Sequence, residues 1–355
     1  MELASLAGRP VSRIGLGTWA IGGLEWGAIP ESQAIATLLR AREAGINFID
    51  TAPIYGHGRS EELIGKAIRA HGRRDDFFLA TKAGLDWGED SITDRGEDSS
   101  RRSAIVANLT RPRLERELEA SLRRLNTDFI DLYQLHWPDP LVPIEETAEI
   151  LLGFQRVGKV RSLGVSNFTV PQMQRFRAVA PLTSNQPPYN LFERAIDEPG
   201  HTEAGHAEAH ASAESSIRDW CATHSVALLC YSPLCRSLLG GRLRAEMRFD
   251  DIRRVDPKFQ PPRFVQYLAA VDRLATYARE RYNKSVAELA VRWVLDRPGV
   301  TIALWGAKNP AQLDTALGVL GWHLDQEAFT TIDQIIAECI HDPIGPEYLT
   351  PATRA

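Results

Sequence analysis

Residues 45–68 read GINFIDTAPIYGHGRSEELIGKAI and contain one strand, one loop and one helix in succession. The apolar run Ile46 to Ile49 predicts a short strand, and Ser60 to Ala70 predicts the helix that covers it. Asp50 and Tyr55 lie between the two, just beyond the end of the strand. A strand followed by a covering helix is the repeating unit of parallel α/β folds.

Seven other apolar or β-branched runs are spaced along the chain in the same way, with helical segments between them. They are Ile14 to Trp19, Phe77 to Thr81, Phe129 to Leu135, Val160 to Val165, Thr183 to Gln186, Val226 to Cys230 and Val300 to Leu304. Eight strands are the number that a (β/α)8 TIM barrel requires, and closure removes the edge strands that an open sheet must protect. We therefore predict an α/β protein in which residues 1–355 form one barrel domain.

The helical segments have apolar residues on one side. In RLERELEASLRRL, Leu114, Leu118, Leu122 and Leu125 share one face, so this helix is expected to cover the sheet. The other predicted helices are Glu31 to Ala44, Ile144 to Gly158, Pro171 to Ala180, Ser212 to His224 and Ala311 to Leu320.

Three stretches are longer than a minimal barrel needs: 86–108, 195–211 and 238–262. Long loops of this kind are expected at the carboxyl-end face of the barrel, as lids or mobile surface. The second contains His201, His206 and His210, which we interpret as a solvated loop because a flexible loop gives no rigid ligand geometry. We predict no metal site.

The composition narrows the class of function. The chain is 44% hydrophobic and 25% charged, with a formal net charge of −5, which suits a globular protein and argues against nucleic acid or an anionic membrane as partner. A small molecule is the expected partner, and the oligomeric state is left open. No secretory signal or long apolar span is apparent, and the four cysteines form no zinc or disulfide pattern, so we expect a cytoplasmic protein.

Four polar residues follow successive predicted strands: Asp50, Tyr55, Lys82 and His136. Strand ends meet at one face of a barrel, so these side chains can share one cavity. Together they suit the delivery of a proton to a carbonyl oxygen that becomes negatively charged as a hydride is transferred to the carbonyl carbon. Tyr55 is the expected acid, Lys82 is expected to lower its pKa, Asp50 to hold Lys82, and His136 to orient the oxygen. Each residue alone also fits a turn, a salt bridge or packing.

The chain resembles the aldo-keto reductase family over nearly its whole length. The matching stretches, in the family's order, are IGLGTW, GINFIDTAPIYGHGRSEELIGKAI, LATK, DLYQLHWPD, VRSLGVSNF, SNQPPYNLFER, YSPL and GAKNPAQL. The family's Asp, Tyr, Lys and His tetrad matches Asp50, Tyr55, Lys82 and His136. The resemblance implies NADP(H), or NAD(H), bound at the mouth of the barrel without a Rossmann fold.

The resemblance also carries over the contacts to the cofactor. Ser166, Asn167 and Gln186 match the group that binds the nicotinamide carboxamide, and Tyr231 matches the ring that stacks on the nicotinamide. Ser232, Leu234 and Arg236 match the pyrophosphate-binding stretch, where Gly240 and Gly241 would let backbone amides approach an anion.

Gly306, Lys308 and Gln312 match the adenosine end of the family's site. Lys308 could neutralise a 2′-phosphate, which favours NADP(H). The chain departs from the family at Thr315 and Ala316, where Glu and Asn are common, so adenine binding is expected to differ here.

Trp19 and Trp137 are expected to form walls of the substrate pocket, while Trp26 and Trp87 fit either a wall or core packing. The substrate class stays open among aldehydes, ketones, aldoses and polyketide-like carbonyl compounds. We predict an NADP(H)-dependent reductase of aldehydes or ketones. The alternatives are an NAD(P)-dependent aldose dehydrogenase, a cofactor-binding regulatory subunit of a membrane channel, and a lyase that uses Lys82 as a Schiff base.

Overall fold

Eight parallel strands close into a barrel in the computed structural model, which describes residues 1–88, 105–200 and 215–354. The barrel runs through β3, β4, β5, β8, β9, β10, β11 and β12 and returns to β3. Each predicted strand is present, with ends within two residues of those expected. The bounds are β3 Ile14–Gly17, β4 Phe48–Asp50, β5 Phe78–Ala83, β8 Ile130–Leu135, β9 Val160–Ser166, β10 Ser184–Gln186, β11 Ala227–Cys230 and β12 Val300–Gly306. The predicted (β/α)8 fold is confirmed.

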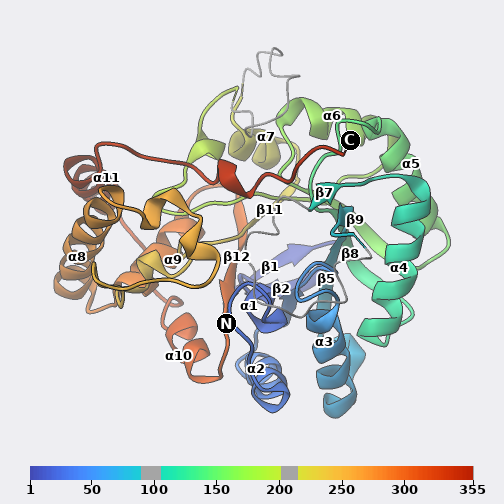
Figure 1. Cartoon of the computed structure of the whole chain (residues 1–355), viewed down its shortest axis with the longest axis horizontal. Coiled ribbons are helices and arrows are strands. Elements are labelled where there is room, and N and C mark those ends of the chain that lie inside the picture. The colour runs from blue at the N-terminus through green and yellow to red at the C-terminus, as the bar shows by residue number, and fades with distance from the viewer. Residues whose placement is uncertain (89–104, 201–214, 355) are drawn as a thin grey trace.

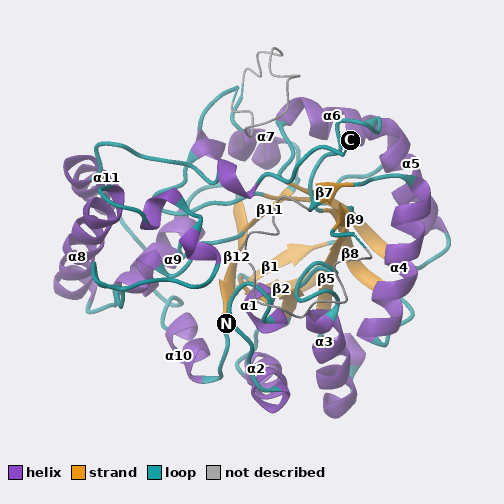
Figure 2. Ribbon diagram, viewed as in Figure 1, coloured by secondary structure: helices purple, strands orange, loops and turns teal. Residues whose placement is uncertain are grey.

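Helices surround the strands on the outside of the barrel (Figure 2). Their bounds are α1 Trp19–Gly22, α2 Glu31–Glu43, α3 Arg59–His71, α4 Arg111–Leu125, α5 Ile144–Arg156, α6 Val170–Val179, α7 Ile217–Thr223, α8 Arg263–Tyr282, α9 Val286–Asp296, α10 Ala311–Leu317 and α11 Gln326–Cys339. The leucine face of α4 is buried, as its spacing predicted. Helix α6 begins with a capping box between Thr169 and Gln172, which satisfies backbone N–H groups at its start.

Helices α8, α9 and α11 were not predicted from the sequence. Helix α9 covers β12, whereas α8 packs against α11 and α9 (Figure 1). The spacing of Tyr267, Val271, Leu274 and Ala278 in α8 was the available signal, since all four are buried. The 238–262 stretch, expected to be a loop, contains three short 3-10 turns at Leu238–Gly240, Ile252–Arg254 and Pro257–Phe259.

A hairpin formed by β1 (Leu3–Leu6) and β2 (Arg9–Ser12) packs against the interior of the barrel. Its Leu6 and Val11 join a buried cluster with Phe48, Phe78 and Leu132 from the strands. These residues lie at or near the amino ends of their strands, so the hairpin closes that end of the barrel. The functional site is therefore expected at the opposite end of the barrel, at the carboxyl ends of the strands.

The C-terminal segment crosses the barrel on the side of the carboxyl ends of the strands. From α11 it runs over the barrel, through a short 3-10 turn at Glu347–Leu349, towards α5 and α6 (Figure 1). It ends beside a small hairpin of β6 (Leu85–Asp86) and β7 (Val106–Ala107), where Ala352 bridges Val106. Arg354 pairs with Asp139 at 2.7 Å and anchors the end. Within the described residues, no helix is long and apolar enough to cross a membrane.

Candidate active site

The four tetrad residues meet at the carboxyl ends of β4, β5 and β8. Lys82 Nζ donates to Asp50 Oδ2 at 2.6 Å, to Thr51 O at 3.0 Å and to Tyr55 Oη at 3.1 Å. Lys82 and Asp50 are buried, whereas Tyr55 and His136 are partly buried and line a pocket. The rings of Tyr55 and His136 lie 5.9 Å apart, nearly perpendicular. The arrangement expected from the strand ends is present.

The electrostatics of Tyr55 differ from the expectation. Burial raises the pKa of Tyr55 well above 10.0, and the charges of Asp50 and Glu25 raise it further. The prediction that the pKa of Tyr55 is lowered is therefore wrong, because the surroundings of the phenol as a whole raise it. The reason is that Asp50 lies beside Lys82 and offsets its field, while burial penalises the phenolate. Burial also lowers the pKa of Lys82, an effect that Asp50 opposes.

His136 is a neutral imidazole. Burial and the nearby charge of Lys82 lower its pKa well below 6.5. Its backbone carbonyl accepts from Asn167 Nδ2 at 3.0 Å, which connects the end of β8 to the end of β9. A neutral imidazole can donate one hydrogen bond into the pocket without carrying charge.

The loop that holds Tyr55 is packed tightly against α1. Gly56 has a φ of +64°, and a side chain there would come within 2.2 Å of the carbonyl oxygen of Gly22. Both the left-handed backbone and the close contact require glycine. The Trp19 ring, from the start of α1, stacks 6.3 Å from the Tyr55 ring. The contact between α1 and this loop thus positions the phenol.

The residues matched to the nicotinamide-binding group form one network. Asn167, with a φ of +62°, accepts from Tyr231 Oη at 3.1 Å, and Ser166 Oγ donates to Gln186 O at 2.7 Å. Gln186 Nε2 donates to Asp50 Oδ1 at 2.7 Å. The network therefore connects directly to the tetrad through the second oxygen of Asp50.

The YSPL stretch ends in a turn with an unusual backbone. Ser232, Cys235, Arg236 and Ser237 all have φ between +44° and +70°, which non-glycine residues rarely adopt. Ser232, Leu234, Arg236 and Ser237 line the pocket. Gly240 and Gly241 do not line the pocket, so the expectation that they approach an anion is not supported. A side chain at Gly241 would instead meet Val286 of α9.

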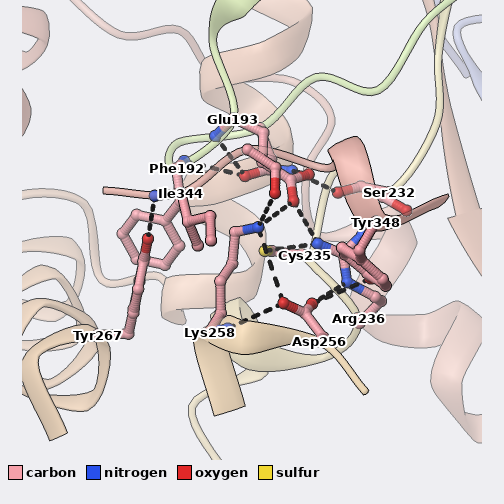
Figure 3. A network of polar contacts seen from close by, with 12 residues as sticks. Phe192, Glu193, Ser232, Cys235, Arg236, Asp256, Lys258, Tyr267, Ile344 and Tyr348 are labelled. Atoms are coloured by element: carbon pink, nitrogen blue, oxygen red, sulfur yellow. Dashed lines mark hydrogen bonds and ion pairs between the residues drawn. The ribbon is translucent and has the colours of Figure 1, made fainter. Parts of the chain in front are cut away.

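Behind this turn lies a buried group of charges that we call the anchor: Glu193, Arg236, Asp256 and Lys258 (Figure 3). Arg236 Nε pairs with Asp256 at 2.6 Å, and Lys258 Nζ pairs with Glu193 at 2.8 Å. Arg236 also pairs with Glu193. Two cations thus face two anions at the back of the pocket.

The anchor holds the C-terminal segment. Lys258 Nζ donates to Gly345 O at 2.8 Å, and Tyr348 Oη donates to Asp256 Oδ2 at 3.1 Å (Figure 3). The Tyr348 ring lies 5.4 Å from the Arg236 guanidinium. Tyr348 and the three residues after it line the pocket, so the anchor fixes one of its walls.

The residues matched to the adenosine end lie at the outer part of the pocket. Gly306, Lys308 and Gln312 all line it. Lys308 Nζ donates to Trp26 O, and Lys308 N donates to Gln312 Oε1 at 2.6 Å. Thr315 and Ala316, where the chain departs from the family, belong to α10 and do not line the pocket.

Trp19 and Trp137 line the pocket, as predicted, and so does Trp26. Trp87 does not; it stacks on His57 with ring centroids 5.1 Å apart. Of the residues predicted for the site, Lys82, Trp87, Gly240 and Gly241 do not line the pocket, and all the others do. Lys82 lies just behind Asp50 and Tyr55.

Sequence reasoning missed Glu25 and residues 348–351, which also line the pocket. Glu25 lies between the matching stretches IGLGTW and GINFIDTAPIYGHGRSEELIGKAI, in a segment that belongs to neither. The C-terminal residues carry no motif, and only folding brings them over the barrel.

No group of three or more potential metal ligands occurs within 1–88, 105–200 and 215–354. His201, His206 and His210 lie outside the described residues, as does most of 86–108 and of 195–211.

Comparison with known proteins agrees with this geometry. Residues 13–337 match the model of the aldo/keto reductase family. The chain is 48% identical over 358 residues to the aldo-keto reductase YhdN of Bacillus subtilis, covering 100% of this chain and 99% of that one. Among solved structures it resembles the glycerol dehydrogenase AKR11B4 from Gluconobacter oxydans, with 42% identity, a TM-score of 0.81 and coverage of 97% and 98%.

A further solved structure, an aldo/keto reductase from Klebsiella pneumoniae in complex with NADP and acetate, matches with 28% identity, a TM-score of 0.65 and coverage of 92% of each chain. The chain belongs to the aldo/keto reductase family and is an oxidoreductase.

Proposed function

We propose that the protein reduces an aldehyde or ketone to the alcohol with NADPH, and that Tyr55 is the proton donor. The observation that carries this proposal is the chain of contacts from Asp50 through Lys82 to Tyr55 Oη, which opens into the pocket. Bound NADPH would supply a hydride to the carbonyl carbon, and the residues of the chain would manage the charge and proton of the oxygen.

Tyr55 holds its proton because burial raises its pKa, so the acid form predominates at neutral pH. As negative charge develops on a substrate oxygen near Tyr55 Oη, the proton moves from Tyr55 to that oxygen. Lys82 Nζ, at 3.1 Å, then stabilises the phenolate left behind. Asp50 keeps Lys82 in place and Gln186 keeps Asp50 in place.

His136 is the proposed orienting donor. Its neutral imidazole faces Tyr55 across the pocket, so a carbonyl oxygen between them can accept a hydrogen bond from each. Two donors that converge on one oxygen define where the carbonyl group binds. His136 thereby favours a single reactive geometry.

The pocket fits NADPH on grounds independent of the relatives. Arg236 Nη1 is buried at the pocket wall and has no hydrogen-bond partner among the described residues, which suits a nearby anion such as a pyrophosphate. Asn167 and Gln186 would bind the carboxamide, Tyr231 the nicotinamide ring, and Ser232 and Leu234 the pyrophosphate. Gly306, Lys308 and Gln312 would bind the adenosine end, with Lys308 favouring the 2′-phosphate of NADP(H) over NAD(H).

The test is consumption of NADPH, followed by its near-ultraviolet absorbance, with a panel of aldehydes and ketones. Wild type should turn over, and Tyr55→Phe should fall by about a hundredfold or more while still binding NADPH. An unchanged rate in Tyr55→Phe would overturn the assignment of the acid. Quenching of protein fluorescence by NADPH and by NADH tests which cofactor is preferred. Binding of NADH that is tenfold tighter than binding of NADPH would overturn the preference for NADPH.

A second candidate is oxidation of an alcohol or aldose, the same chemistry in reverse. The similarity to a glycerol dehydrogenase over nearly the whole chain favours measuring this direction as well. Turnover in either direction would exclude a purely regulatory subunit. A cytoplasmic location is part of the proposal, and the four free cysteines suit a reducing compartment.

A further inference from the structure

A buried carboxylate lies on the outside of the barrel, beside the end of the strand that carries Lys82. Glu117 of α4 is 6% exposed and is not used by the proposed mechanism. Its Oε2 accepts from Gly84 N at 2.6 Å, and its Oε1 accepts from Arg113 Nη2 at 2.9 Å. Gly84 follows β5 directly, two residues after Lys82. Glu117 thus connects α4 to the point where the chain leaves the barrel.

The chain turns at Gly84, and α4 holds this turn. Strand β5 pairs with β8 as far as Ala83. The next residue, Gly84, has a φ of +93°, which glycine adopts readily. Arg113 Nη2 donates to Leu85 O at 2.9 Å, while Glu117 accepts from Gly84 N. One pair of side chains on α4 therefore binds the backbone on both sides of the Gly84–Leu85 peptide bond.

The turn sets the place of one wall of the pocket. Leu85 lines the pocket together with Ile105 and Leu349. Ile105 O accepts from Ala352 N at 3.1 Å, which joins this wall to the C-terminal segment. The residues matched to the cofactor follow β9 to β12, whereas Leu85 follows β5, beside the tetrad. The wall at Leu85 therefore faces the substrate.

Ionisable groups from four elements surround Glu117. Arg113 is the cation bonded to it, and Asp86 shares this cation at 3.3 Å. Glu61 adds a negative charge and is itself paired with Arg124 at 2.7 Å. The groups are Arg113 and Arg124 on α4, Glu61 on α3, Asp86 on β6 and the phenol of Tyr133 on β8.

The balance of these groups places the titration of Glu117 near neutral pH. Burial raises the pKa of Glu117 from 4.5 to about 7, and Glu61 adds to the increase, although Arg113 and the N–H of Gly84 oppose it. The ionised carboxylate makes charge-assisted hydrogen bonds, which are roughly twice as strong as neutral ones. Protonation therefore weakens the hold of Glu117 on Gly84 and on Arg113.

We propose that Glu117 is a positioning residue: its ionised carboxylate holds the Gly84 turn, and thereby Leu85, in the geometry that binds the carbonyl substrate, and its protonation weakens substrate binding. Glu117 does not line the pocket, so it acts through the turn. The inference rests on the proposed carbonyl reduction and adds to it a control of substrate binding by pH.

The test measures KM and kcat for propionaldehyde and benzaldehyde at saturating NADPH, about one unit below and one unit above pH 7. Glu117→Gln keeps the size of the side chain and an acceptor for Gly84 N, but it is uncharged at both pH values and so mimics the protonated acid. Glu115→Gln is the matched control. It neutralises another glutamate of α4, which pairs at the surface with Arg111, four residues earlier, at 3.7 Å.

In wild type the KM for the aldehyde should be about fivefold higher at the lower pH, because the protonated carboxyl group holds the turn less firmly. The kcat should change by less than about twofold, since pairing of β5 with β8 keeps Lys82 in place. Glu117→Gln should show the higher KM at both pH values. Glu115→Gln should follow wild type.

Thermal unfolding separates positioning from a purely structural role. Because the pKa of Glu117 is raised in the folded protein, its protonation stabilises the fold; this contribution is complete below pH 4.5 and is lost as the pH rises through about 7. Glu117→Gln is spared this loss. Its melting temperature relative to wild type should therefore rise by about 4 °C across this range. General loosening of the fold would not combine a relative gain in stability with a higher KM.

The outcomes separate this inference from the proposed function. If Glu117→Gln keeps the pH dependence of the wild-type KM, or stays within about twofold of wild type above pH 7, the inference is overturned and the proposed function stands. Parallel losses of kcat and melting temperature would make Glu117 a structural residue and also overturn it. If wild type neither reduces the two aldehydes nor oxidises the corresponding alcohols, the proposed function fails and the inference with it.

Discussion

The tetrad and the anchor are both buried groups of charges at the same end of the barrel, and they differ in what they do. In the tetrad, Lys82 and Asp50 lie behind Tyr55, whose hydroxyl group reaches the pocket. In the anchor, Glu193, Arg236, Asp256 and Lys258 neutralise one another and hold Gly345 and Tyr348. Both require charges to be removed from water, which is costly unless the charges are paired.

The difference between the two groups is the position of a transferable proton. The tetrad residues come from strand ends and a short loop, and the proton of Tyr55 faces the pocket. The anchor residues come from long connections, and Arg236 and Lys258 donate to carboxylates and to the carbonyl of Gly345. Among the described residues only Arg236 Nη1 of this group has no partner, on the side where Arg236 lines the pocket. Loss of the Tyr55 proton should therefore abolish chemistry with little effect on stability, whereas loss of the Lys258 charge should mainly lower stability.

The largest expected effect is on catalysis by Tyr55→Phe. The ring and its packing remain, but the proton is absent, so kcat should fall by about a hundredfold or more. The melting temperature should change little. Steady-state kinetics and thermal unfolding measure both, with Tyr277→Phe in α8 as the control because Tyr277 does not line the pocket. A large loss of stability in Tyr55→Phe would remove the contrast with the anchor.

The next effect is on stability, in Lys258→Met. The change removes one of the two buried cations that pair with Glu193 and the donor to the carbonyl of Gly345, so unfolding should become easier by about 3–5 kcal/mol. Urea denaturation measures the difference. Lys66→Met, which breaks an exposed pair with Glu31, should cost no more than about 1 kcal/mol. Equal effects of the two variants would mean that the anchor does not stabilise the fold.

The anchor should also make stability depend on pH. Although burial raises it, the charges of Arg236 and Lys258 lower the pKa of Glu193 from 4.5 to about 2. The pairing of Glu193 thus stabilises the fold fully above pH 4.5, and this stabilisation is lost as the pH falls towards 2. The free energy of unfolding should decrease by about 3 kcal/mol over this range.

Urea denaturation between these pH values, comparing wild type with Glu193→Gln, tests this dependence. The variant should start less stable and lose less stability as the pH falls, because residue 193 no longer takes up a proton. Parallel losses in the two proteins would contradict the lowered pKa.

The smallest effect should come from Tyr348→Phe. It removes one hydrogen bond to Asp256 but keeps the ring beside Arg236, so stability should fall by about 1 kcal/mol. Because Tyr348 lines the pocket, the KM of larger substrates should rise while kcat with small aldehydes is nearly kept. A fall in kcat comparable to that of Tyr55→Phe would place Tyr348 in the chemistry and blur the distinction between the two groups.

The sequence alone determined the barrel and the position of the tetrad. Strand and helix periodicities are local, so runs such as Val160 to Val165 and the leucine face of α4 could be predicted from neighbouring residues. In a closed parallel barrel the strand ends meet at one face, so Asp50, Lys82 and His136 were expected together from their places after successive strands.

Only the tertiary structure decided the walls of the pocket and the ionisation of its groups. The anchor joins segments around Glu193, Arg236, Lys258 and Tyr348, and Glu25 contacts the 238–262 stretch; no local pattern encodes such contacts. The pKa of Tyr55 likewise depends on burial and on the balance of Asp50 against Lys82, which requires distances and depth rather than residue identity. The sequence therefore predicted the strands and helices, which depend on neighbouring residues, but not which charges become buried together, which depends on contacts between distant segments.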